Sequence, residues 1–472
     1  MRRATSSSHV PVLDFRRRQS SDLTLFANAG PAQWIDGAGK GDDRRRMRRI
    51  LLFLSAALAA FAEVRIVTLA QVLGLAMTQS AEAALARLDE RRAAAAVQAA
   101  KDPFYPKIFA GSGLAYSSGF PLSIEGSAPS ILESRAIASV YNQPQKMMLE
   151  KARADQKTAG VAAVMRQENV SYRAALLYVE AGRLAAAVRA AKEQAGTLER
   201  VAETVKARVE AGRELAIEGR RAQLRNAQAR QRTLRLETAL ADAETQLGLL
   251  LGMADGDRAR PADPETPIRV AVTSEGEAVV AALQNSKEIR RLESVVIAKG
   301  FERKSHEAAR LPRLDLVAQY GLFSKLNNYD KFFNRFQRHN GQFGVSIQIP
   351  LLPSQASKAQ KEMVDGELAG LRTQLNAERG RASAQARKAW AEIAAQETGV
   401  EVANLDLAIA REQTTLLLAL LEEGRATQKQ LEEARFTENE KWMALFDARF
   451  GLDRARLELL KETGTLTAAL RN

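Results

Sequence analysis

One sequence pattern occurs twice along this chain of 472 residues. Three residue pairs share an offset of 206 positions: Ser80 and Ser286, Pro106 and Pro312, Pro144 and Pro350. Farther along, the offset grows to 212, where "VEAGRE" (209–214) aligns with "EEGRA" (422–426). Agreement at four separate markers predicts two copies of one structural unit, and any fold of the chain must accommodate both.

Each copy predicts the same series of elements. The first predicts a helix at 68–101, strands at 107–120 and 134–144, and helices at 146–211 and 214–250. The second predicts a helix at 275–308, strands at 313–323 and 341–351, and helices at 354–423 and 427–463. The long helix of each copy would span roughly 100 Å, which the two shorter helices match when laid end to end. Each copy therefore predicts one continuous helix beside a stacked pair.

The long helices have the periodicity of coiled coils. In the first copy Leu184, Val188, Ala191, Ala195 and Leu198 recur at alternating intervals of four and three. Small residues on such a seam allow neighbouring helices to approach closely. The remaining faces mix Lys, Arg, Glu and Gln, as a solvated surface would.

The strands of the second copy alternate between two kinds of side chain. Leu314, Leu316, Ala318, Tyr320 and Leu322 share one face. The opposite face carries Asp315, Gln319 and Gly321. Segments of about 10 residues with this alternation fit a transmembrane β-strand. A soluble hairpin with one solvated face gives the same pattern, so the strands alone leave both interpretations open.

The number of strands constrains the membrane interpretation further. Four strands leave two open edges, which lipid does not tolerate. Copies of the chain would have to complete the sheet. Two chains would supply about 8 strands, too few for an aqueous channel, and three would supply 12.

The N-terminal 62 residues have the composition of a segment outside the fold. "MRRILLFLSAALAAFA" (47–62) has a basic start, a short apolar run and an Ala-x-Ala end, which predicts a cleaved signal peptide. Residues 1–46 are polar and Arg-rich, and are interpreted as a disordered leader or an over-extended start. The remaining 410 residues hold 58 Lys and Arg against 51 Asp and Glu, a net charge of +7.

The composition argues against several functions. No basic patch with interleaved aromatic residues stands out, which disfavours nucleic-acid binding. The chain has no cysteine, which excludes disulfides, thiolate metal sites and an acylated N-terminal cysteine. The three histidines, His9, His306 and His339, lie far apart in sequence, so we expect no metal site. Neither a catalytic constellation nor a cofactor motif is visible, and we expect no enzyme activity.

Several stretches resemble the TolC-like outer membrane efflux proteins, also called outer membrane factors, over residues 66–470. The opening helix "VTLAQVLGLAMTQSAE" (67–82) is similar to that of the family. So are the strand-to-helix junctions "YNQPQKMMLEKA" (141–152) and "SIQIPLLPSQASKAQ" (346–360). The helical turns "ARVEAGRELAIEGRRAQ" (207–223) and "LLEEGRATQKQLEEAR" (420–435) complete the set. The junctions lack the glycines common in the family, and we expect proline to make the bend here.

This resemblance implies a mainly α fold with a small β part, built from repeats at 63–273 and 274–472. It implies a homotrimer with a 12-stranded β-barrel in the outer membrane, continued by a 12-helix α-barrel in the periplasm. Its function would be a passive duct of a tripartite efflux or secretion system that docks a periplasmic adaptor and an inner-membrane transporter. The alternative is a secreted coiled-coil structural or adaptor protein without a membrane barrel. The cargo is not readable from the chain.

Two sets of residues carry this implied function. Gly212 and Gly424 lie where a helix must reverse, and glycine accepts a positive φ there. By the resemblance they mark the periplasmic tip and adaptor contact, flanked by four residues: Arg213, Leu215, Arg425 and Thr427.

The second set would line the lumen just past the turns. The resemblance places Glu218, Gln430 and Glu433 there. In a trimer Glu433 would form a ring of three carboxylates that favours cations. An ordinary exposed glutamate is the alternative, and the neutral Gln430 predicts a weaker ring.

Overall fold

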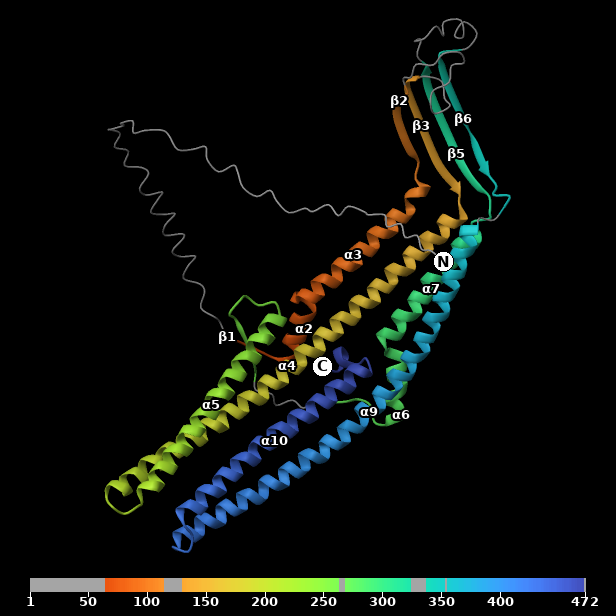
Figure 1. Ribbon diagram of the computed structural model, residues 1–472. Helices are drawn as coiled ribbons and strands as arrows, with labels where there is room; N and C mark the ends of the chain where they lie inside the picture. Colours follow the sequence, from red (N-terminus) through yellow and green to blue (C-terminus); the bar gives the residue numbers. More distant parts are fainter. Residues whose placement is uncertain (1–63, 114–129, 263–267, 324–336, 353–354, 471–472) are drawn as a thin grey trace, which may run out of the picture. The chain divides into compact units, whose positions relative to one another are not determined.

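The computed structural model describes residues 64–113, 130–262, 268–323, 337–352 and 355–470 (Figure 1). The predicted leader (1–46) and signal peptide (47–62) lie outside these residues. The helices of the first repeat are α2 (Leu69–Gln79), α3 (Ala81–Lys101), α4 (Gln143–Glu210) and α5 (Ala216–Leu250). Those of the second are α6 (Glu275–Asn285), α7 (Lys287–Ala308), α9 (Gln355–Glu422), α10 (Gln428–Glu462) and the short α11 (Leu466–Ala469).

Four strands agree with the predicted order: β2 (Lys107–Gly113), β3 (Ser130–Tyr141), β5 (Arg313–Phe323) and β6 (His339–Gln348). Two short strands, β1 (Val64–Val67) and β4 (Arg258–Pro261), were not predicted. Strand β3 begins before the predicted 134 and ends before 144, because Asn142 already caps the next helix through its side chain, which accepts from Gln145 N. Pro144 occupies the first turn of α4, where its missing N–H costs nothing.

The helices pack as the length argument predicts. Helix α4 lies along α2, α3 and α5, and α9 lies along α6, α7 and α10. The two repeats meet where α4 contacts α7 and α10. In the half of the helical part that is farther from the sheet, neighbouring helices therefore follow the order α5, α4, α10, α9. In the half nearer the sheet they follow the order α3, α4, α7, α9 (Figure 1). Within the described residues, no helix has an apolar stretch long enough to cross a membrane.

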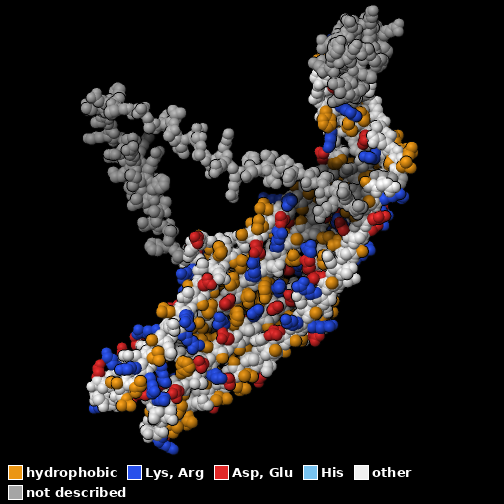
Figure 2. All heavy atoms as spheres, in the orientation of Figure 1, with side chains coloured by type: hydrophobic (Ala, Val, Ile, Leu, Met, Phe, Trp, Pro, Cys, Tyr) orange, Lys and Arg blue, Asp and Glu red, His pale blue; other side chains and the backbone are white. Residues whose placement is uncertain are grey.

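Small side chains make close helix packing possible. The residues of α4 that are buried against its several neighbouring helices include Ala174, Ala175, Ala181, Ala187 and Ala191. Because alanine loses no side-chain entropy on burial, such a seam is tight at little entropic cost. On the face shown in Figure 2, charged side chains of both signs are interspersed over the helices, as predicted for a solvated surface.

The opening helix of each repeat is broken, which corrects the prediction of single helices at 68–101 and 275–308. Ser80 separates α2 from α3, and its Oγ accepts a hydrogen bond from Ala83 N at 3.1 Å. Ser286 separates α6 from α7, and its Oγ accepts from Ile289 N at 3.3 Å. The serine pair that marks the sequence repeat is therefore a pair of internal helix caps.

A glycine from the last helix packs against each break. Gly252 follows α5 with a φ of 73°, and Gly464 follows α10 with a φ of 65°. A Cβ on Gly252 would lie 2.7 Å from the carbonyl oxygen of Gln79, at the end of α2. A Cβ on Gly464 would lie 2.8 Å from the Cβ of Asn285, at the end of α6. Both positions therefore require glycine for its backbone conformation and for its lack of a side chain.

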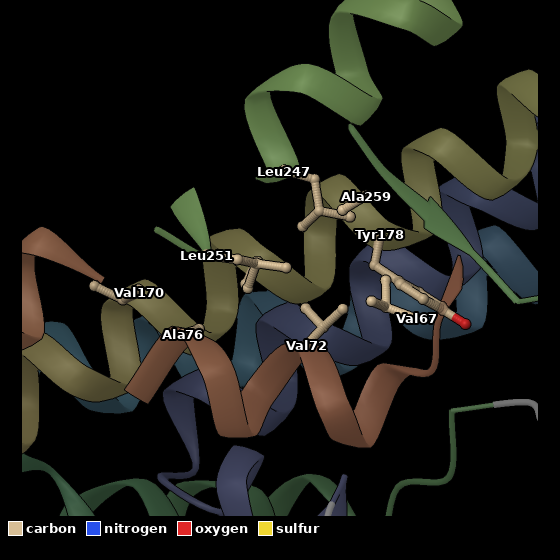
Figure 3. Close-up of a cluster of buried hydrophobic side chains, with 9 residues drawn as sticks. Val67, Val72, Ala76, Val170, Tyr178, Leu247, Leu251 and Ala259 are labelled. Atoms are coloured by element: carbon tan, nitrogen blue, oxygen red, sulfur yellow. The ribbon is translucent and has the colours of Figure 1, made fainter. Parts of the chain in front are cut away.

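A small sheet that the sequence did not reveal lies beside α4 and α5, just before α2 begins. Strands β1 and β4 pair in parallel, with Val67 opposite Pro261. Val67 packs with Val72, Tyr178, Leu247 and other side chains of a cluster drawn from α2, α4, α5 and β4 (Figure 3). The Tyr178 hydroxyl donates to the carbonyl oxygen of Ala262 at 3.1 Å. The linker between the repeats is thereby held against the helices.

We expect Gly252→Ala to destabilise the protein by about 2 kcal/mol or more. The substituted residue would have to hold a positive φ and displace the Gln79 backbone. The matched control is Gly300→Ala in α7, where a Cβ meets nothing within 4 Å. That change should be neutral or stabilising by up to about 1 kcal/mol. Thermal unfolding followed by circular dichroism compares the two, and equal stability would contradict the close contact.

Candidate functional site

The two hairpins form one sheet at one end of the helices. The four strands follow the order β2, β3, β5, β6, and all neighbours are antiparallel. Strand β3 of the first repeat pairs with β5 of the second, with Ala136 opposite Ala318. This pairing makes β2 and β6 the edge strands (Figure 1).

The register places an apolar row across one face of this sheet. The side chains that share it are Ile108, Ala136, Ala138, Leu314, Leu316, Ala318, Tyr320, Phe343, Val345 and Ile347. Phe343 is 77% exposed and Ile108 is 74% exposed. Within the described residues, no helix packs across this face. An isolated sheet of this kind does not bury its own apolar surface, so something other than the described residues must cover it.

The opposite face carries the charges. All five Lys, Arg, Asp and Glu residues of the four strands lie on it: Lys107, Glu133, Arg135, Arg313 and Asp315. Gln319 joins them and donates from Nε2 to Oε1 of Glu133 at 2.8 Å. Separation of charge onto a single face is what a sheet between lipid and water requires.

Ion pairs tie the helices together next to the sheet. Three of them join α7 to α9: Lys299 with Glu367 at 2.5 Å, Arg303 with Asp365 at 2.5 Å, and Lys361 with Glu307 at 3.0 Å. The hydrogen bond from Lys361 holds the pKa of Glu307 below its ordinary value. The hydrogen bond to Glu367 raises the pKa of Lys299. These pairs connect α7 to α9 close to the sheet.

The helical turns at the other end have matching geometry in the two repeats. Gly212 has a φ of 69° and Gly424 a φ of 71°, as predicted. The N–H of Arg213 donates to the carbonyl oxygen of Arg208 at 2.8 Å. The N–H of Arg425 donates to the carbonyl oxygen of Leu420 at 2.7 Å. Each turn is thus a Schellman motif, in which the glycine lets the chain close over the last carbonyls of the helix.

The helices that return from these turns begin differently. Thr427 caps α10, and its N–H donates to Oε1 of Gln430 at 2.9 Å. The N–H of Gln430 donates to Oγ1 of Thr427 at 3.4 Å, which completes a capping box. Leu215 holds the same place before α5 and makes no side-chain cap. The amide of Gln430, which the sequence assigned to the lumen, is therefore engaged in the cap.

The acids just past the turns meet an arginine that sequence reasoning missed. Arg225 on α5 lies 3.3 Å from Glu432 and 3.7 Å from Glu433, both on α10. Glu218 instead pairs within α5, with Arg221 at 2.5 Å. The structure therefore brings Glu433 to the contact between the two helical hairpins. Arg225 lies 207 positions from Glu432, so no local spacing could have revealed the pair.

Solved structures of outer membrane proteins, among them CusC, VceC and CmeC, share this fold of two long helical columns per repeat joined through a two-faced sheet. CusC, which forms a transmembrane channel, matches with a TM-score of 0.70 at 16% identity, covering 86% of this chain and 95% of that chain. The outer membrane protein VceC of Vibrio cholerae matches with a TM-score of 0.68 at 16% identity, covering 84% and 96%. The CmeC outer membrane channel of Campylobacter jejuni matches with a TM-score of 0.71 at 12% identity, covering 84% and 86%.

These comparisons confirm the TolC-like fold that the sequence motifs predicted. No family model matches the sequence, and no curated protein matches it either. At identities this low, the likeness shows the fold, and the function must be argued from the sheet and the turns.

We expect Thr427→Ala to lower the stability of the α9–α10 hairpin by about 1 kcal/mol, because the substitution removes the cap of α10. Leu215→Ala is the matched control, since Leu215 holds the equivalent position without a capping bond. Thermal unfolding of both variants measures the difference. An equal loss in both would show that the capping box contributes nothing.

Proposed function

We propose that the chain is the outer membrane channel of an efflux or secretion system, a passive duct across the outer membrane and the periplasm. The observation that carries this proposal is the sheet whose charges all lie on one face and whose other face exposes apolar side chains such as Ile108 and Phe343. A lipid bilayer is the surrounding that suits such an apolar face.

Closure of the sheet requires further copies of the chain. The two edges differ, because β2 belongs to the first repeat and β6 to the second. An edge of one copy therefore pairs with the other edge of the next, which is a head-to-tail contact that closes into a ring. Three copies would give a barrel of about 12 strands, wide enough for water, with the charged face lining the lumen.

The helices supply the periplasmic part of the duct. Helices α4 and α9 have 68 residues each, which correspond to about 100 Å. Because they start directly after β3 and β6, the helical wall continues the barrel. We infer that the adaptor docks at the far turns, around Gly212, Arg213 and Leu215 and around Gly424, Arg425 and Thr427. An inner-membrane transporter would then deliver the cargo through the adaptor.

The alternative, a secreted coiled-coil structural or adaptor protein, leaves the apolar face of the sheet unexplained. A soluble hairpin would need a covering core, and none of the described helices provides one. The solved structures with the same fold are channels rather than enzymes, which supports a role without catalysis.

The oligomer is tested on protein extracted from membranes with detergent. We expect a trimer that migrates as such in a gel until it is heated, and that conducts ions in planar bilayers. The physical reason is that each subunit needs its neighbours to pair both sheet edges. A stable monomer that stays dissolved without detergent and forms no pores would overturn the proposal.

The lumen assignment is tested separately with Glu433→Ala. Loss of three carboxylates near the turns should shift the cation-to-anion permeability ratio toward one, as measured from reversal potentials in bilayers. Glu433→Asp retains the charge and serves as the control, with the ratio kept. Unchanged selectivity in the alanine variant would remove Glu433 from the lumen.

A further inference from the structure

A hollow interrupts the apolar face of the four-stranded sheet. It has a volume of about 330 Å³ and lies across β3, β5 and β6, which are neighbours in the sheet (Figure 1). Its existence does not depend on a second copy, because all three strands belong to one chain. The register places six of its lining residues on the apolar face: Ser134, Ala136, Ala318, Tyr320, Gly341 and Phe343.

Two aromatic rings form the walls of this hollow. Tyr320 lies opposite Gly341, and Phe343 lies opposite Ala318, so the two rings occupy diagonal positions on β5 and β6. Diagonal positions of an antiparallel pair are about 7–8 Å apart. Tyr320 is 40% exposed and Phe343 is 77% exposed, and the residues between them are too short to cover either ring.

A polar pair lies at the end of the hollow that is farther from the helices. The hydroxyl oxygen of Tyr320 lies 2.8 Å from Nδ1 of His339, an exposed residue on the same face. When the hydroxyl donates to Nδ1, the imidazole proton lies on Nε2. Among the described residues, Nε2 has no hydrogen-bond partner. The apolar face therefore ends in an N–H donor that is available to a ligand.

The height of this pair corresponds to a membrane interface if the sheet spans a bilayer. From Ile347, near the helices, β6 rises about 27 Å to His339, and less in height once the strand is tilted. The apolar band of a transmembrane β-barrel is about 25 Å tall and is flanked by aromatic residues. His339 and Tyr320 thus lie at the level of the headgroups of the far leaflet, on the side away from the helices. The hollow lies below them, at the level of the acyl chains.

The next copy in the ring does not provide a partner for His339. Strand β2, which would pair with β6, ends at this level in Gly111, Ser112 and Gly113. The Ser112 hydroxyl already donates to the carbonyl oxygen of Ser130 at 3.2 Å. A polar side chain at the edge of hydrocarbon is costly without a partner, so a donor here indicates an acceptor in the lipid headgroup.

We propose that the hollow binds one acyl chain of a phosphate-bearing lipid of the far leaflet, and that Nε2 of His339 donates to a phosphate oxygen of its headgroup. The inference rests on the proposed duct and assigns to it a lipid site that the passage of cargo does not require. A lipid fits the site because the hollow is continuous with the apolar face, and because its donor lies only at the headgroup end.

The acyl chain is tested with trimers of the full chain that are extracted in detergent, stripped of lipid and titrated with phosphatidylglycerol. Native mass spectrometry counts the lipids retained. Ala136→Leu fills the hollow, and Ala138→Leu is the matched control, since Ala138 lies on the same face of β3, opposite Leu316, and does not line the hollow. We expect the parent and the control to retain one lipid per subunit. Ala136→Leu should need about tenfold more lipid for equal occupancy.

The headgroup contact is tested with His339→Phe, which keeps an aromatic ring and removes the donor. The variant should bind phosphatidylglycerol about fivefold more weakly than the parent does. Diacylglycerol, which has no phosphate, should bind both proteins equally. This variant leaves the hollow intact, so it tests the site even where Ala136→Leu fails to assemble.

The outcomes separate the lipid site from the duct. Equal retention by the parent, Ala136→Leu and Ala138→Leu would identify a non-specific lipid layer and overturn the site, while the duct stands. Equal titration curves for His339→Phe and the parent with phosphatidylglycerol would overturn it as well. A parent chain that forms neither heat-sensitive trimers nor pores is failure of the proposed duct itself.

Discussion

The unpaired backbone at the edges of one four-stranded sheet is the constraint on which the rest of this protein depends. Among the described residues, strands β2 and β6 each have one side without a partner, and one of the two faces of their sheet is apolar. An open edge in lipid costs several kcal/mol for each unsatisfied group. Under the proposed function, the sheet is complete only in an assembly, so insertion into the membrane and association of copies become a single requirement.

The helical part meets the same requirement with different chemistry. Within the chain, close packing comes from alanine seams and from glycines that bring one helix end against another, as Gly252 does at Gln79. The outer faces of α9 and α5 expose larger side chains, among them Leu405 and Leu234.

The presence of two repeats in one chain explains why the two sides of the molecule differ. The two repeats lie side by side in one chain. One side of the molecule is therefore formed by the first repeat, through β2 and α5, and the other side by the second repeat, through β6 and α9. The turns show how the copies diverged, because Thr427 has a capping box and Leu215 has none. Such differences leave the backbone of the turns alike while changing the side chains offered to a partner.

Sequence alone determined much of this protein. The 206- and 212-residue offsets predicted two repeats, and apolar periodicity predicted the long helices to within a few residues, since both are local properties of the chain. The breaks at Ser80 and Ser286 escaped prediction, although those residues had marked the repeat, because a serine caps a helix only where tertiary contacts interrupt it. The pairing of β1 with β4 and of Arg225 with Glu432 joins residues about 200 positions apart, which no local pattern encodes. Only the tertiary structure decided which strands lie at the edges and which helix faces stay uncovered, because those depend on how the two repeats pack against each other.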